Sequence, residues 1–239
     1  MCSHYQAEKR RRQIEKRFGI TLPPNWEPPP GGMHIHPTYM APIIRRPAEL
    51  NAGDEAVPDF EVVDGHFGLL PPFAKDLRYS AQYRTYNART ETVAQLRTFK
   101  PSWEKARHCI VPCEAIYEPD WRTNEHVPTR FTAANDDMLG VAGIWAPWTN
   151  PATSKIELSF AMLTLNADDH PMFKLMHRPD PKRPPDKQDK RMVVILPAGL
   201  YEAWLDAPVE RSFDFIAQYP ADLLCMTPEP VERPQMQLF

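Results

Sequence analysis

The second residue of the chain is a cysteine, and this position offers chemistry that an internal cysteine lacks. If Met1 is removed, Cys2 carries a free α-amine and a thiol on adjacent carbons. The amine titrates near about 7.7–8.0 and a thiol near about 8.5, so we expect both nucleophiles to be partly active at neutral pH. Such an aminothiol condenses with an aldehyde to an imine, and its thiol then closes a five-membered thiazolidine ring. The alternative interpretation is an ordinary cysteine in a frayed terminus.

Three further places combine reactive side chains with the start or end of an expected element. Asn87 and Arg89 precede a helix start, where they could orient an amine and pair with a phosphate, or simply form a capped turn. Glu118 ends an apolar strand, where burial would lift the pKa of its carboxyl towards the range useful for proton transfer, unless it faces water. His177 follows a strand and could protonate a leaving oxygen, with His170 as the competing candidate.

A histidine and two cysteines, His108, Cys109 and Cys113, resemble part of a metal site. A second pair of ligands at zinc-finger spacing is absent from the sequence, so we interpret the two cysteines as structural residues of a strand. We therefore predict no metal and no cofactor.

Composition limits the class of protein. The chain has 239 residues, 42% of them hydrophobic and 25% charged, which is ordinary for a soluble globular domain. Its 28 prolines against 9 glycines favour long rigid connections between short elements. A net charge of −3 means that any DNA-binding face must be a local basic patch. No apolar run is long enough for a membrane span and the start of the chain is strongly charged, so we expect a cytoplasmic monomer without a signal peptide.

The elements that would position these residues are mostly strands. We predict a basic helix over residues 6–18, a loop-like stretch over 22–58, and a hairpin over 60–70 that turns at Asp64-Gly65. Apolar or alternating runs predict four more strands, over 107–117, 138–145, 157–165 and 192–196. Short helices are expected over 93–99 and 198–206, and an exposed charged loop over 179–190. These elements indicate a β-rich α+β fold in a single domain over residues 1–239.

Several of these segments occur together in an order that resembles a known family. They are Cys2 directly after the initiator, the run Asn87-Ala88-Arg89-Thr90-Glu91-Thr92, the run Arg107 to Pro112 leading into Tyr117-Glu118, and Leu163-Thr164 followed by a histidine and Arg191-Met192. In this order they resemble the SOS response-associated peptidase (SRAP) family of abasic-site processing proteins, from residue 2 to about residue 207. The family implies mixed or antiparallel barrel-like sheets flanked by short helices.

The resemblance implies a sensor that crosslinks to abasic sites in single-stranded DNA through Cys2, with thiol autopeptidase and lyase-like activity. In that scheme the chain removes its own Met1, Asn87 orients the amine of Cys2, Glu118 transfers protons, and His177 opens the deoxyribose to its aldehyde. The residues then expected to contact DNA are Arg89, Phe67, Pro42, His4, Thr164 and Arg178.

A charged insertion over residues 179–190 separates His177 from Arg191. Its basic side chains, Lys182, Arg183, Lys187 and Lys190, could contact DNA or belong to a solvated loop. Two other functions stay open: a cysteine peptidase that uses Cys2, Glu118 and His177 on other peptides, and a non-catalytic module that binds DNA or protein.

Overall fold

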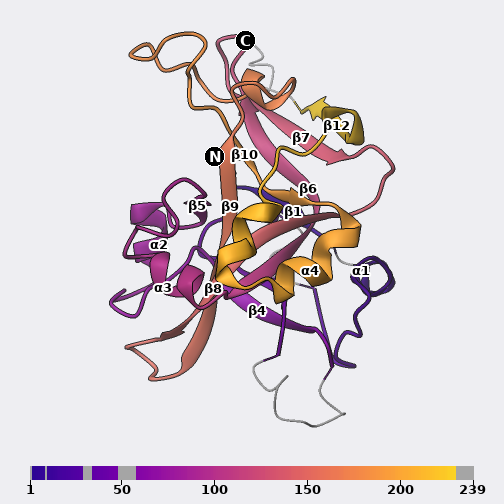
Figure 1. Cartoon of the computed structure of the whole chain (residues 1–239), viewed down its shortest axis with the longest axis vertical. Helices are drawn as coiled ribbons and strands as arrows, with labels where there is room; N and C mark the ends of the chain where they lie inside the picture. Colours follow the sequence, from indigo (N-terminus) through magenta and orange to yellow (C-terminus); the bar gives the residue numbers. More distant parts are fainter. Residues whose placement is uncertain (1, 9, 29–33, 48–57, 230–239) are drawn as a thin grey trace, which may run out of the picture.

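A large sheet with short helices around it makes up the fold in the computed structural model, which describes residues 2–8, 10–28, 34–47 and 58–229 (Figure 1). The β-rich α+β class predicted from the sequence is therefore confirmed. Met1 and residues 29–33 and 48–57 of the predicted loop over 22–58 lie outside the described residues. The loop prediction is wrong for residues 34–35 and 40–45, which form strands because partners elsewhere in the chain pair with them.

Twelve strands pair into this sheet among the described residues. The strands are β1 (Tyr5–Ala7), β2 (His34–Ile35), β3 (Met40–Arg45), β4 (Glu61–Phe67), β5 (Asn87–Arg89), β6 (His108–Asp120), β7 (Val127–Ala133), β8 (Leu139–Thr149), β9 (Ile156–Asn166), β10 (Arg191–Val193), β11 (Ile195–Leu196) and β12 (Leu224–Pro228). The α-helices are α1 (Arg11–Phe18), α2 (Arg78–Tyr83), α3 (Lys100–Glu104) and α4 (Tyr201–Asp206). The 3₁₀ turns are η2 (Phe173–Leu175), η3 (Ala198–Leu200), η4 (Val209–Phe215) and η5 (Ala221–Leu223). None of the described helices has the length and apolar character to cross a membrane.

The sheet closes on itself through β6, which confirms the expected barrel-like arrangement. From β8 the hydrogen-bonded order runs through β9, β4 and β3, and β3 meets β6 where Ile44 lies opposite Ile110. β6 then pairs antiparallel with β8, from His108 opposite Ile144 to Cys113 opposite Leu139. The second half of β6 leaves this ring to pair with β1 and β7. The end of β6 therefore lies beside the start of the chain.

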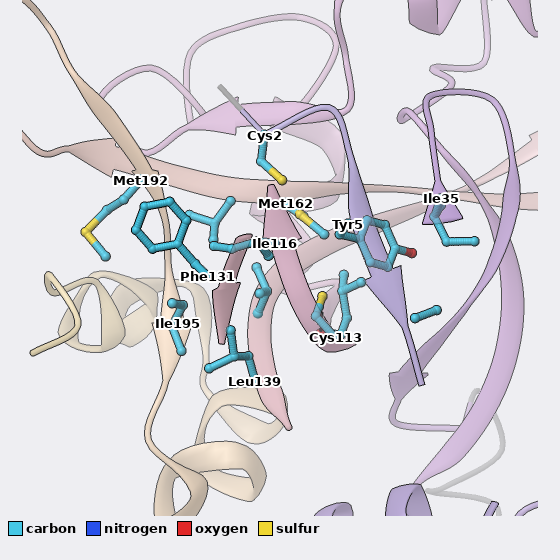
Figure 2. Close-up of a cluster of buried hydrophobic side chains, with 14 of the residues drawn as sticks. Cys2, Tyr5, Ile35, Cys113, Ile116, Phe131, Leu139, Met162, Met192 and Ile195 are labelled. Carbon is cyan, nitrogen blue, oxygen red and sulfur yellow. Dashed lines mark hydrogen bonds between the residues drawn. The ribbon is translucent and has the colours of Figure 1, made fainter. Parts of the chain in front are cut away.

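Successive side chains of the long strands pack alternately into two hydrophobic clusters. In β9, Phe160 and Met162 belong to one cluster, whereas Ala161 and Leu163 belong to the other. This division follows from the pleat, which points successive side chains to opposite faces of a sheet. The first cluster includes Cys2, and Figure 2 shows that cysteine at the edge of the group that contains Ile116 and Met162. The start of the chain is thus part of the core.

The hairpin predicted over residues 60–70 is wrong. β4 runs without a turn through Asp64 and Gly65, because β3 provides a continuous antiparallel partner from Met40 opposite His66 to Arg45 opposite Glu61. The glycine serves a different purpose. A Cβ atom at Gly65 would lie 3.3 Å from the ring of Phe160, so its absence allows β4 to approach the neighbouring strand closely.

Two helix predictions are corrected as well. Residues 5–7 form strand β1, and the helix begins only at Arg11; it ends at Phe18, with Gly19 in a left-handed conformation (φ 65°). Residues 93–99 form turns, and the helix there starts at Lys100, where Pro101 favours a first turn. The helix expected over 198–206 is confirmed as η3 followed by α4.

Candidate active site

The candidate site forms where the start of the chain meets the end of β6. Tyr5 lies opposite Ile116 in the pairing of β1 with β6, and Tyr117 N–H donates a 3.0 Å hydrogen bond to the carbonyl oxygen of His4. This pairing carries Cys2 to the end of β6, close enough for the charge of Glu118 to act on its thiol. Both side chains are buried, with 0% of Cys2 and 1% of Glu118 exposed.

β5 brings Asn87 to the same place. The strand lies parallel to β9, with Asn87 opposite Met162, and its side-chain Nδ2 donates a 2.7 Å hydrogen bond to the carbonyl oxygen of Cys2. The Oδ1 atom of Asn87 is buried and has no hydrogen-bond partner among the described residues. A buried acceptor without a donor is costly, so this atom is available to a new N–H group beside it.

A close pair of Glu118 and His177 forms the proton-transfer part of the site. His177 Nε2 lies 2.8 Å from Glu118 Oε2. Burial acts to raise the pKa of Glu118, but the ammonium charge at the start of the chain and the adjacent His177 outweigh it, so the net pKa lies below the usual value. Glu118 is therefore a carboxylate at neutral pH, buried beside His177 and the start of the chain.

The backbone of His177 is held in an unusual conformation. Its φ of 61° lies in the left-handed region, which is uncommon for a residue other than glycine. His177 N–H donates a 2.6 Å hydrogen bond to the carbonyl oxygen of Pro119, and Lys190 Nζ donates to the carbonyl oxygens of Met176 (2.5 Å) and His177 (2.7 Å). These bonds fix the direction in which the imidazole leaves the chain, towards Glu118.

The thiol of Cys2 is protonated in this environment. Burial, assisted by the negative charge of Glu118, raises the pKa of Cys2 to about 12, and its Sγ donates to the carbonyl oxygen of His4 at 3.3 Å. The expectation that this thiol is partly ionised at neutral pH is therefore wrong. In this environment the thiol of Cys2 would need a base before it could act as a nucleophile.

The competing histidine has a structural environment. His170 is 2% exposed, its Nε2 donates to the carbonyl oxygen of Tyr219 (2.9 Å), and its Nδ1 accepts from the backbone N–H groups of Met172 and Phe173 (both 3.2 Å). Both ring nitrogens thus have backbone partners. Of the two candidates, His177 is the one that the structure brings to Glu118.

The arginines near the site are held by acidic residues. Arg89 donates to Asp189 Oδ2, so its expected contact with a phosphate competes with this carboxylate. Arg191 binds both oxygens of Glu91 (2.7 and 2.8 Å). Together with His177 and Arg178, the two arginines border a hollow of about 320 Å³. This basic hollow next to His177 is suited to a phosphate.

Three of the expected DNA contacts are core residues in this structure. Phe67 is 0% exposed and its ring packs between those of Tyr5 and Phe160, with centroids 5.3 and 5.4 Å away. Thr164 is also 0% exposed, and Pro42 is buried within β3. Direct stacking or lining contacts with DNA do not fit this burial, because the neighbouring strands cover all three side chains.

His4 stacks against aromatic rings instead of presenting a charge. Its ring centroid lies 4.1 Å from that of Tyr117 and 4.4 Å from that of His36, and its Nε2 lies 2.7 Å from His34 Nδ1. Partial burial, followed by the two neighbouring histidines, lowers the pKa of His4 to about 4. His4 is therefore neutral at neutral pH, and a contact with DNA through it would rest on stacking.

The predicted structural role of Cys109 and Cys113 fits their complete burial in β6. His108 does not join them in a metal site; its Nε2 lies 3.0 Å from Ser212 Oγ. Within the part of the chain that the structure describes, no group of three or more His, Cys, Asp or Glu side chains is arranged to hold a metal ion.

Sequence reasoning missed Asp189, and it gave Lys190 only a possible contact with DNA or a place in a solvated loop. Both lie in the charged insertion, where side chains are usually solvated. Here Asp189 binds Arg89, and Lys190, only 7% exposed, binds the backbone of His177. Their position directly before Arg191 was the one signal in the sequence, and nothing local distinguishes it from the rest of the insertion.

Known proteins resemble this chain in sequence and in fold. A family model described as SOS response associated peptidase (SRAP) matches residues 1–232. A crystal structure of a protein from Bordetella bronchiseptica is 42% identical, covers 96% of this chain and 100% of its own, and superimposes with a TM-score of 0.82. A protein from Bacteroides thetaiotaomicron (18% identity, 95% and 91% coverage, TM-score 0.72) and a phage-related protein from B. bronchiseptica (19%, 95% and 94%, TM-score 0.63) share the fold.

Proposed function

The chain belongs to the SOS response-associated peptidase family, and from this premise we propose that it traps abasic sites in single-stranded DNA as a covalent adduct of Cys2. Membership of the family supports a role linked to DNA damage, and the family name supports an enzymatic activity. The finer proposal is that removal of Met1 exposes the amine of Cys2, which then reacts with the sugar aldehyde left where a base has been lost.

One observation carries this proposal: Asn87, Glu118 and His177 converge on Cys2 from distant parts of the chain. Asn87 binds the carbonyl oxygen of Cys2 at 2.7 Å, and Glu118, paired with His177 at 2.8 Å, raises the pKa of the Cys2 thiol. An internal structural cysteine needs none of these polar neighbours. Their burial around the start of the chain favours chemistry at its amine.

The proposed reaction has two steps, imine formation and ring closure. The α-amine of Cys2 attacks the aldehyde carbon and water leaves, giving an imine. The sulfur then bonds to the imine carbon while the thiol proton reaches the nitrogen, closing the thiazolidine. In this scheme Asn87 Oδ1 accepts a hydrogen bond from the amine, His177 protonates the ring oxygen as deoxyribose opens, and Glu118 carries the thiol proton to nitrogen.

The electrostatics of Glu118 suit this order of events. In the chain that still carries Met1, the terminal ammonium lowers the pKa of Glu118, whereas burial raises it. Once Met1 is removed the terminal ammonium is that of Cys2, and its conversion to a neutral imine would take this charge away and raise the pKa of the carboxyl. Glu118 therefore becomes a stronger base at the step in which the protonated thiol must lose its proton.

A peptidase that acts on other peptides is less well supported by the same site. A cysteine peptidase needs a thiolate nucleophile, which a neighbouring positive charge stabilises. Glu118 does the opposite, because its negative charge contributes to raising the pKa of Cys2 to about 12. Removal of Met1 by the chain itself remains part of the proposal, since it uses the same group of residues.

The test is to incubate the purified protein with a single-stranded oligonucleotide that contains an abasic site. We expect an adduct that survives denaturation, with the mass of the protein without Met1 plus the DNA minus one water. Cys2→Ala keeps the amine but cannot close the ring, so its adduct should be lost on denaturation, whereas Cys225→Ser at an exposed cysteine should behave as wild type. Quantitative retention of Met1, or an equally stable adduct with Cys2→Ser, would overturn the proposal.

A further inference from the structure

A second hollow, of about 630 Å³, also borders His177. Its apolar lining comes from Trp121, Leu175 and three prolines of the insertion, Pro179, Pro181 and Pro185. We propose that this hollow binds an unpaired nucleobase next to the abasic nucleotide in the same strand, with Trp121 as its stacking surface. This inference rests on the proposed function and assigns a role to the insertion.

The wall that residues 179–190 contribute is built by its own hydrogen bonds. Gln188 Oε1 accepts from Asp180 N–H at 2.7 Å, and Gln188 Nε2 donates to the carbonyl oxygens of Arg183 (3.0 Å) and Pro184 (2.8 Å). The segment forms the orange loop at the top left of Figure 1. A loop closed internally in this way keeps its prolines facing one hollow, so the binding surface exists before a ligand arrives.

The lining has the chemistry of a single-strand binding surface. Proteins that bind unpaired strands combine aromatic rings, on which bases stack, with cations that follow the phosphates. Trp121 supplies the ring, and the guanidinium carbon of Arg178 lies 5.5 Å from its centroid, so the ring and the cation are already associated. The proline rings and Leu175 add apolar contacts. These side chains have no hydrogen-bonding groups, so they do not select one base over another.

Charge also favours a nucleotide over a neutral ligand. Lys174, Arg122 and Arg183 border the same hollow, with Asp180 as the acidic residue of its lining. Arg122 is bound to Asp120, and Arg183 lies 3.4 Å from Asp180, but Lys174 is exposed at the rim. A base in the hollow would thus have a cation within reach of its phosphate.

The position beside His177 identifies which nucleotide is bound. His177 borders both this hollow and the smaller basic one that Arg89 and Arg191 line. If the abasic sugar lies at His177, the strand must continue past that residue in at least one direction. The hollow at Trp121 is a place for the base of the neighbouring nucleotide.

The experiment uses single-stranded oligonucleotides with a central tetrahydrofuran abasic analogue, which has no aldehyde and cannot form the adduct. One oligonucleotide carries natural bases on both sides of the analogue, and the other carries base-free spacers there. We expect Trp121→Ala to weaken binding of the base-flanked strand by about tenfold, as base–aromatic stacking predicts, and to leave binding of the spacer-flanked strand unchanged. Trp121→Phe, which keeps an aromatic ring, should retain most of the affinity.

Tyr83→Ala is the matched control, since Tyr83 is 59% exposed on α2 and outside the hollow. Equal weakening of both strands by Trp121→Ala, or no weakening of either, overturns the nucleobase site, provided that thermal unfolding shows the variant folded. The adduct assay with a natural abasic site is run in parallel. A wild-type protein without adduct contradicts the proposed function, whereas an adduct together with no base-dependent effect of Trp121 contradicts only this inference.

Discussion

Lys190 Nζ lies 2.7 Å from the carbonyl oxygen of His177, so the two ends of the charged insertion are joined at the candidate site. The same ammonium donates to the carbonyl oxygen of Met176 at 2.5 Å and is only 7% exposed. Burial lowers the pKa of Lys190, with the charge of Asp168 acting in the opposite direction. The insertion therefore lengthens the chain between His177 and Arg191 while the backbone of His177 stays fixed.

Replacement of Lys190 should slow adduct formation through His177. Lys190→Met leaves two carbonyl oxygens without their donor, which costs about 1–3 kcal/mol and releases the left-handed backbone of His177. We expect the single-turnover rate of adduct formation to fall about tenfold or more, with little change in affinity for the tetrahydrofuran analogue. Lys190→Arg keeps the charge and donors and should restore part of the rate.

The pH profile distinguishes this positioning role from a general loss of stability. If Lys190 only stabilises the fold, Lys190→Met lowers the thermal midpoint and leaves the shape of the rate profile unchanged. If it holds His177 against Glu118, the profile of the variant must shift as well. An unchanged rate in a folded variant would contradict the positioning role.

Glu118→Gln should change how the rate depends on pH. The pKa of Glu118 is lower than its usual value, so in the wild type the carboxylate is present at and above neutral pH and ring closure should be nearly independent of pH there. The amide of the variant cannot accept the thiol proton, and loss of the negative charge lowers the raised pKa of Cys2. We expect a slow reaction that accelerates about tenfold per pH unit, because it depends on the thiolate fraction.

The comparison needs rates over a range of pH with Glu114→Gln, an exchange elsewhere on β6, as the control. A flat profile in Glu118→Gln would show that another group removes the thiol proton. The carboxylate also contributes to folding: since its folded pKa is depressed, its stabilisation is present above the usual value of 4.5 and is lost as pH falls through the folded pKa.

Both polar atoms of the Asn87 side-chain amide, Nδ2 and Oδ1, should affect the rate of imine formation. Asn87→Ala removes the donor to the carbonyl oxygen of Cys2, and leaving that buried group unpaired costs about 1–3 kcal/mol. Asn87→Asp places a carboxylate beside the amine, which stabilises its ammonium form and slows attack on the aldehyde at neutral pH. Rates for the aspartate variant should recover at high pH, while those for the alanine variant should not.

Imine formation can be followed separately by trapping with borohydride, and Asn25→Ala at an exposed position is the control. Wild-type trapping rates in both Asn87 variants would show that the contact with Cys2 only anchors the start of the chain.

The strands that carry the site were predictable, and the contacts between them were not. Apolar runs over residues 107–117 and 138–145 predicted β6 and β8, because strands buried on both faces read as nearly continuous hydrophobic segments. Alternation of apolar side chains over 157–165 predicted β9. Gly65 misled the prediction since glycine serves turns and close backbone approach alike. The pKa of Cys2 could not be predicted either, because it depends on burial by strands far along the chain.

The pairing of Arg89 with Asp189 was likewise not predictable from the sequence, because the two residues lie 100 positions apart. Arg89 comes from β5 and Asp189 from the insertion, where Arg183 and Arg191 also lie 3.5 Å from its carboxylate. A DNA phosphate at Arg89 must compete with this carboxylate, so Asp189→Asn should bind single-stranded DNA several-fold more tightly. The slope of log affinity against log salt should steepen by about 0.7, the value for one more phosphate contact on a single strand. Asp222→Asn makes the same charge change at an exposed residue outside the hollow that Arg89 borders and should leave the slope unaltered. Because the gain requires Arg89, it should vanish when Arg89→Ala is added; a gain that persists, or weaker binding by Asp189→Asn alone, would mean that the carboxylate orders the loop and does not compete with DNA.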